Sequence, residues 1–185
     1  MSKQVNTLEQ QVSKTREEII KETHRIEEDA LLSSKGHFAC SYFWTKFHLW
    51  IGIPIVVTAS IAGCSFIANN ALIGAILSAV VAVLSAIVTF LNPNEKSSAH
   101  MHAGNSYEAL RNEVRIFRTI DCWTKTDDQL LPDHLKNFST QKNQLNQSST
   151  QIPWWAYKIA RRQISSGAGS YKIDQPPSTE TVIDK

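Results

Sequence analysis

The chain has 185 residues, of which 42% are hydrophobic, and a formal net charge of +2 at pH 7. Domains usually span about 50 to 250 residues, so this length suits one membrane segment with one modest helical domain and leaves little room for a second, enzymatic domain. A net charge so close to zero gives no reason to expect a nucleic-acid partner.

The pattern of residues 3–30 predicts a long amphipathic helix. Its apolar positions recur every seven residues, at Val5, Val12, Ile19 and Ile26. The intervening heptad positions are mostly polar, so we expect this helix to pack against other helices of its domain or of a neighbouring subunit, and not to form an independent coiled coil. Gly36 is expected to break it. Residues 1–48 are therefore assigned to an N-terminal cytoplasmic helix and an aromatic lead-in to the membrane.

The middle of the chain, between Lys46 and Glu95, contains no Asp, Glu, Lys or Arg. Two apolar runs, residues 49–68 and 71–91, fill this gap, and each has about the 20 residues needed to cross a hydrocarbon core. We therefore predict an all-α membrane protein: a two-helix transmembrane hairpin over residues 49–91, flanked by cytoplasmic helices. The alternative is the buried hairpin of a water-soluble protein, which would need an apolar coat that the polar remainder does not supply.

Charges beside the two runs predict how they are oriented. Lys35 and Lys46 precede the first run, Lys96 and Arg111 follow the second, and the connecting turn has neither Lys nor Arg. The excess of Lys and Arg in cytoplasmic loops then places both termini in the cytoplasm, so we expect a multi-pass protein of the inner (cell) membrane. Residues 1–34 do not have the pattern of a signal peptide.

Residues 92–166 are expected to form a cytoplasmic helical region. Asn92-Pro93-Asn94 should stop the second span, because proline lacks an amide donor and restricts the residue before it. A helix should follow with one apolar stripe, formed by Ala103, Tyr107, Leu110, Val114 and Phe117.

Further along, residues 130–138 suggest a short helix with Pro132 in its first turn, and a polar stretch, residues 139–151, follows it. Pro153 begins a basic and aromatic helix, which lies either on anionic lipid or on the cytoplasmic bundle. The composition of residues 167–185 predicts a disordered tail.

The second span and the helix after it carry a family pattern. The segment from Thr89 to Lys96, followed by His100, Ala103, Tyr107, Leu110, Glu113 and Arg115, resembles the SLATT family, the SMODS and SLOG-associating two-transmembrane effector domains. Residues 47–54 and 153–157 are also similar to that pattern, so the resemblance covers about residues 30–165. The positions that it singles out are Pro93, Glu95, His100, Tyr107, Leu110, Glu113 and Arg115.

The resemblance implies a membrane effector of a bacterial conflict (antiphage) system. Such an effector is thought to form a pore in the lipid bilayer, or to disrupt it, when a partner that makes or senses a nucleotide signal triggers it. We expect a homo-oligomer on this basis. A non-conducting membrane anchor or scaffold for a cytoplasmic partner is the alternative function.

Both apolar runs have a face of small residues. In the second run this face is Ala71, Gly74, Ser78, Ala82, Ser85 and Thr89, and in the first it is Thr58, Ala62 and Ser65. Small faces let helices approach closely in lipid, so they form either a dry contact between the two spans or the lining of an oligomeric pore.

Signs of an active site are missing from the sequence. There is no Ser-His-Asp arrangement with supporting spacing, no glycine-rich phosphate loop and no pair of acids on one helical face, so we expect neither an enzyme nor a cofactor. His48, His100 and His102 are expected to gather at the cytoplasmic boundary, where histidine can bind a metal, sense pH or simply pack. We expect packing and no metal site, because no Cys or paired carboxylate accompanies them.

Overall fold

The computed structural model describes residues 2–67, 71–124 and 130–171, with side chains for residues 13–64 of the first range and for the other two ranges. The described residues are 89% helical and contain no strand. Its elements are α1 (Ser2–Ile67), α2 (Ala71–Leu91), α3 (Pro93–Ile116), the π-helical turn η1 (Phe117–Asp121), α4 (Leu131–Ser148) and α5 (Trp154–Ser165). The all-helical prediction is confirmed.

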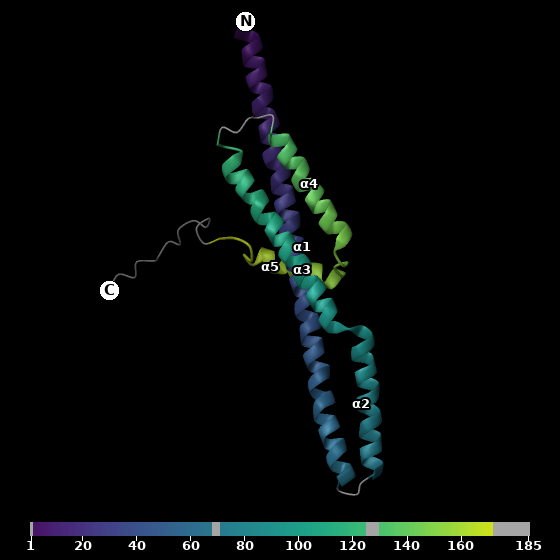
Figure 1. Ribbon diagram of the computed structural model, residues 1–185. Helices are drawn as coiled ribbons and strands as arrows, with labels where there is room; N and C mark the ends of the chain where they lie inside the picture. The colour runs from purple at the N-terminus through teal and green to yellow at the C-terminus, as the bar shows by residue number, and fades with distance from the viewer. Residues whose placement is uncertain (1, 68–70, 125–129, 172–185) are drawn as a thin grey trace, which may run out of the picture.

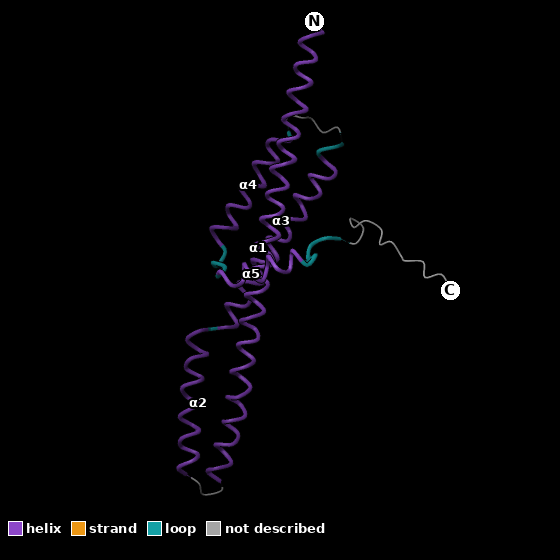
Figure 2. Tube along the Cα trace, turned by 180° about the vertical axis from the view of Figure 1, so that it is seen from behind, coloured by secondary structure: helices purple, strands orange, loops and turns teal. Residues whose placement is uncertain are grey.

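Helix α1 runs the length of the molecule and contacts each of the other helices (Figure 1). Its 66 residues correspond to about 100 Å at 1.5 Å per residue. Helices α3 and α4 lie beside the polar part of α1, α2 lies beside its C-terminal part, and α5 crosses α1 at the level of α3, as the view from behind also shows (Figure 2). Polar and apolar parts of the chain therefore share one continuous helix.

The predicted break at Gly36 is wrong, because α1 passes through this residue without interruption. Gly36 is buried, and a Cβ atom there would meet the side chain of Ile152 at 3.1 Å. A glycine inside a helix costs about 1 kcal/mol relative to alanine. Packing between α3 on one side and α5 on the other holds this stretch helical, so the glycine allows a close approach and does not end the helix.

The core of the polar half lies between α1, α3 and α4. Ile19 and Ile26 of the heptad pattern are buried there, next to the α3 residues Leu110 and Val114. Phe117 packs edge-on against Phe138 of α4, with ring centroids 5.3 Å apart. The prediction that the heptad stripe packs within the domain is thus confirmed for Ile19 and Ile26; the side chains of Val5 and Val12 lie outside the described residues.

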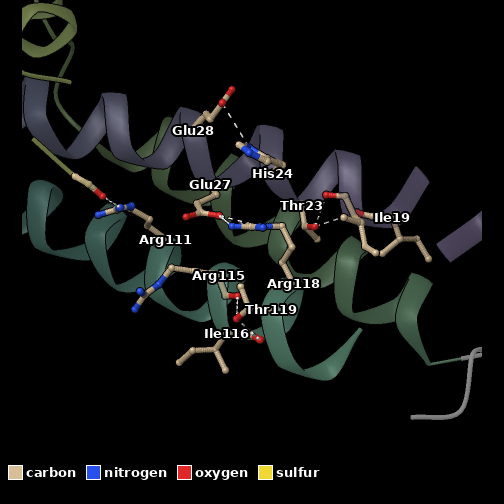
Figure 3. A network of polar contacts seen from close by, with 12 residues as sticks. Ile19, Thr23, His24, Glu27, Glu28, Arg111, Arg115, Ile116, Arg118 and Thr119 are labelled. Atoms are coloured by element: carbon tan, nitrogen blue, oxygen red, sulfur yellow. Dashed lines mark hydrogen bonds and ion pairs between the residues drawn. The ribbon is translucent and has the colours of Figure 1, made fainter. Parts of the chain in front are cut away.

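Two charged side chains join α1 to η1 beside this core. Glu27, which is 9% exposed, accepts hydrogen bonds on Oε2 from Nη2 and Nε of Arg118, at 2.8 and 3.1 Å (Figure 3). Thr23, one turn earlier on α1, satisfies its own hydroxyl by donating to the carbonyl of Ile19 at 3.0 Å. The polar groups at this contact are paired, as burial requires.

The transition from α2 to α3 takes a single residue. Asn92 has φ 42°, in the left-handed region that asparagine tolerates better than most residues, and Pro93 then occupies the first turn of α3. The Asn92 amide donates to the carbonyl of Val88 at 3.0 Å, which closes α2, and its side chain bonds Glu95. The predicted stop at this sequence is confirmed.

Helix α4 is longer than expected. It continues through residues 139–148, which the sequence suggested to be a polar connection. Leu145 packs against the core, and the Tyr107 hydroxyl donates to Oδ1 of Asn146 at 2.7 Å. These contacts with α3 stabilise helical turns whose own composition is polar.

The chain after α5 turns back onto α3. Arg111 donates to the carbonyl of Gly169 at 2.6 Å, and the guanidinium of Arg115 lies 4.5 Å from the ring centre of Tyr171. Gly167 and Gly169 have φ of +94° and +120°, which favours glycine at both positions. The disorder predicted from residue 167 is therefore wrong for residues 167–171, and residues 172–185 lie outside the described part.

Candidate functional site

The C-terminal part of α1 and the whole of α2 are long and apolar enough to cross a membrane. Only 6% of the most apolar window in each helix is buried within the molecule, whereas the core helix of a water-soluble protein is mostly buried. Large apolar side chains are exposed along both helices, among them Ile53, Val56 and Ile61 on α1 and Leu72, Ile76, Val83 and Phe90 on α2. Exposed apolar surface of this extent is typical of a site that contacts a membrane or another protein.

Helix α2 meets α1 along a stripe of positions three or four residues apart. On α2 this stripe consists of Gly74, which is buried, and the partly buried Leu77, Val81, Leu84, Val88 and Leu91. On α1 the corresponding positions are Ile51, Ile55, Thr58 and Ala62, and Ala62 is only 4% exposed. This spacing is that of helices packed at a small crossing angle.

The small-residue face of α2 coincides only in part with this contact. Gly74 is buried and Ser85 is partly buried, but Ala71, Ser78, Ala82 and Thr89 are exposed. At 100° per residue the centre of the small face lies about a quarter turn away from the centre of the contact stripe. On α1, Thr58 and Ala62 lie in the contact, and the side chain of Ser65 is outside the described part. Within one chain, most of the small face of α2 is therefore left uncovered.

Three hydroxyl groups join α1 to the start of α3 just above the apolar helices. The Ser97 hydroxyl lies 3.0 Å from Oγ of Ser41 and 2.7 Å from Oγ1 of Thr45, and it also reaches the carbonyl of Ser41 at 3.0 Å. Ser41 and Ser97 are buried. Small side chains at this level let the two helices come close while their polar atoms satisfy one another.

One turn farther from the apolar helices, two buried histidines meet. Nδ1 of His37 lies 2.9 Å from Nδ1 of His100, and Tyr107 stacks on His37 with ring centroids 5.5 Å apart. Burial, together with the neighbouring His100, lowers the pKa of His37 to about 4, and burial also lowers the pKa of His100. Both rings are therefore neutral at pH 7, and one nitrogen donates while the other accepts.

The expected gathering of His48, His100 and His102 does not occur: His48 is exposed eleven residues, or about 16 Å, farther along α1 than His37, and His102 is exposed on another face of α3. The partner of His100 is His37, which sequence reasoning missed. The sequence did contain a sign that His37 is buried. His37 shares a helical face with the small residues Ala30, Ser34 and Ser41, and all four are buried. Within the described ranges, no group of three or more His, Cys, Asp or Glu residues could hold a metal ion.

The other positions of the family pattern are spread along α3. Pro93 opens the helix, and Glu95 is exposed in its first turn. Leu110 lies in the core, Glu113 is exposed and Arg115 rests on Tyr171. Two of the seven positions, His100 and Tyr107, both contact His37, and Tyr107 also shares the buried core with Leu110.

Aromatic and basic side chains surround the level at which the apolar helices begin. Nζ of Lys96 lies 4.6 Å from the ring centre of Trp44, and Nζ of Lys46 lies 5.4 Å from that of Tyr42. Tyr42 and Trp50 are 66% and 77% exposed. Amphipathic rings and long cations of this kind are typical of the interface between hydrocarbon and water.

Helix α5 docks on α1 at the same level. Ala156 and Ala160 are fully buried, and Trp155 packs against Phe43 with ring centroids 5.2 Å apart. Docking on the bundle, one of the two alternatives for this helix, is therefore observed. It leaves the basic residues of α5 exposed.

Comparison with known protein families finds no matching family, and comparisons with curated proteins and with solved structures find no match either.

Proposed function

We propose that this protein is a SLATT-type membrane effector. In this proposal α2 and the C-terminal part of α1 cross the inner membrane as a hairpin, and both termini lie in the cytoplasm. Several copies assemble and permeabilise the membrane when a cytoplasmic partner triggers them. The resemblance to SLATT proteins implies that the partner makes or senses a nucleotide signal.

The observation that carries the proposal is the uncovered small-residue face of α2. Ser78, Ala82 and Thr89 are exposed although α2 already packs against α1 through a neighbouring stripe. Helices associate in lipid through small residues that let their backbones approach, so an unoccupied small face suits contact with a second copy. The Thr89 hydroxyl donates to the carbonyl of Ser85 at 2.9 Å, which satisfies its donor within the helix.

The same face suits the lining of a simple pore. Its hydroxyl groups are weakly polar, and residues 49–91 contain no Asp, Glu, Lys, Arg or His. Channels that select ions do so with rings of carbonyl groups or charged side chains. A pore lined by Ser78, Ser85 and Thr89 would discriminate poorly between ions, which is sufficient for an effector that damages a membrane.

Cross-linking tests the assembly directly. Ser78→Cys, made in a Cys64→Ser background so that the exposed native thiol does not contribute, should give a disulfide-linked dimer when proteoliposomes are oxidised. Val83→Cys, at a position 60% exposed on another face of α2, is the matched control and should give much less dimer. Equal yields from both positions would contradict an assembly through the small face.

Permeabilisation is tested with the purified full chain in dye-loaded liposomes, with and without the protein encoded beside it in the genome. We expect dye release when the partner and its nucleotide signal are present. Dye that stays inside under every condition would support the non-conducting anchor in place of the effector.

A further inference from the structure

The apolar groove at the top of the α1 span, together with the side of α5 above it, has the chemistry of a phospholipid site. The groove has a volume of about 430 Å³ and is lined by Lys46, Leu49, Trp50, Ile53 and Pro54. One end is cationic and the rest is apolar. Pro54 has no amide hydrogen, so it cannot donate to the carbonyl of Trp50 as a helical residue normally would. The groove therefore offers an apolar wall to an acyl chain and a cation to a headgroup.

The orientation of α5 follows from its contacts on α1. Arg161 lines a second groove with Glu28, on the side of α5 away from the apolar helices. Trp155 contacts Phe43, which is fifteen residues closer to those helices than Glu28. The side of α5 that carries Trp155 therefore faces the predicted membrane.

Two further side chains share that side. Ile159 and Arg162 follow Trp155 by four and seven residues, the spacing of one helical face. Ile159 is 42% exposed and Arg162 is exposed. Phe43 precedes Leu49 by six residues, or about 9 Å along the helix, which brings α5 close to the headgroup layer that is about 5–8 Å thick on each side of the hydrocarbon.

The groove lies directly below the C-terminal half of α5. Glu28 and Leu32, which line the groove that Arg161 also lines, are each eighteen residues before Lys46 and Trp50. Eighteen residues are five turns at 3.6 residues per turn, so the two pairs occupy the same face of α1. Arg162 therefore lies on the side of α5 toward this part of α1, and Lys46 lines the end of the groove nearest α5.

Charge selects the kind of lipid. Between Asp29 and Glu108 the sequence has one acidic residue, Glu95, and residues 134–171 have none. The same stretches supply Lys35, Lys46, Lys96, Lys158, Arg161 and Arg162. Juxtamembrane cations of this density attract anionic headgroups.

We propose that this groove and α5 together bind one anionic glycerophospholipid of the leaflet nearest the helical bundle. The phosphate lies between Lys46 and Arg162, and one acyl chain lies along Leu49, Ile53 and Pro54. The lipid joins α5 to the span, so the position of α5 responds to the lipid composition. This site rests on the membrane location in the proposed function but not on pore formation.

The test measures lipid retained by the detergent-solubilised full chain, using native mass spectrometry after incubation with equal amounts of phosphatidylglycerol and phosphatidylcholine. The wild type should retain phosphatidylglycerol preferentially. Lys46→Gln with Arg162→Gln should lower that retention on the order of tenfold or more, since each cation near an anionic headgroup contributes about fivefold. Lys21→Gln with Arg25→Gln removes two exposed cations far from the groove and should leave retention unchanged.

A second variant tests the apolar part of the site. Ile53→Trp fills the groove and keeps both cations, so it should also reduce retention. The lipid site is wrong if the wild type does not distinguish the two lipids, if the control pair loses as much as Lys46→Gln with Arg162→Gln, or if Ile53→Trp retains lipid like the wild type. Dye release is a separate readout: a protein that selects phosphatidylglycerol but never releases dye would overturn only the proposed effector function.

Discussion

His37 and His100 are joined through their Nδ1 atoms at 2.9 Å, and each ring is at most 3% exposed. Such a bond requires one protonated and one unprotonated Nδ1, so it is compatible with two neutral rings and is lost when both nitrogens carry protons. Because His37 comes from α1 and His100 from α3, the pair connects the helix that continues into the first apolar segment with the helix that follows the second.

This pair predicts a pH-dependent stability. The pKa of His37 is about 4 in the folded chain and 6.5 as its ordinary value, so the unfolded state binds more protons between these values. Stability from this group is therefore complete above pH 6.5 and falls as the pH drops toward 4, by about 2 kcal/mol at pH 5. Thermal unfolding in detergent, followed by circular dichroism at pH 7.5 and 5, measures the change.

Replacing both rings isolates the effect. His37→Gln with His100→Gln should be less stable at pH 7.5 and should lose less stability on acidification than the wild type. His48→Gln with His102→Gln, which alters two exposed histidines, should follow the wild-type profile. Identical acid sensitivity in all three proteins would contradict the role assigned to the buried pair.

Gly104 predicts a local packing limit between α3 and α1. A Cβ atom at this position would lie 2.6 Å from the Phe38 ring, closer than packed atoms tolerate. Gly104→Ala should therefore destabilise the chain by about 1–3 kcal/mol, despite the better helix propensity of alanine. The midpoint of thermal unfolding shows whether the substitution raises or lowers the stability. Gly52→Ala is the control, because no atom lies within 4 Å of a Cβ atom there, and it should not destabilise the protein.

The proposed assembly predicts which face of α2 is sensitive to size. Ser78→Leu should abolish dye release and growth arrest while insertion persists, because a bulky side chain separates helix backbones without reducing hydrophobicity. Val83→Leu, on another face, should have little effect. Membrane-fraction levels control for expression. Loss of dye release in both variants, or in neither, would contradict the assignment of the small-residue face.

Gly74 and Ser78 share the small-residue face of α2, but only Gly74 also lies in the contact with α1. It is the buried residue of α2, in the contact with α1 of the same chain. Gly74→Leu should therefore lower thermal stability as well as dye release, whereas Ser78→Leu should leave stability nearly unchanged.

Topology is predicted by the distribution of lysine and arginine. Reporter fusions at residues 20 and 175 should be active only in the cytoplasm, and a fusion at residue 70 only outside it. An external signal from either terminal fusion would contradict the hairpin.

The sequence predicts those features that depend on local composition. The two long apolar helices follow from a charge-free stretch, and the end of α2 follows from Asn92 and Pro93, because hydrophobicity and backbone restrictions act within a few residues. The features that the sequence did not predict depend on residues far apart in the chain. Gly36 stays helical against Ile152, and α4 is extended by a bond from Tyr107 to Asn146.

The candidate site likewise has features that the sequence predicts and features that it does not. The small face of α2 can be read from spacing alone, but which part of it α1 covers cannot, because that depends on the rotation of one helix against another. The pairing of His100 with His37 was likewise hidden, since the two residues are 63 positions apart. His48 is closer than His37 to the first apolar run in sequence, but it is exposed and takes no part in the pair.

The two apolar helices differ in how they are connected to the rest of the molecule. Helix α1 is continuous from its polar half into its apolar half, so a rotation of the helical bundle about α1 would be transmitted directly to the first apolar helix. Helix α2 is joined to α3 through the single left-handed residue Asn92, so its helical connection to the bundle is interrupted there. A rotation of one apolar helix relative to the other would change which side of α2 is covered.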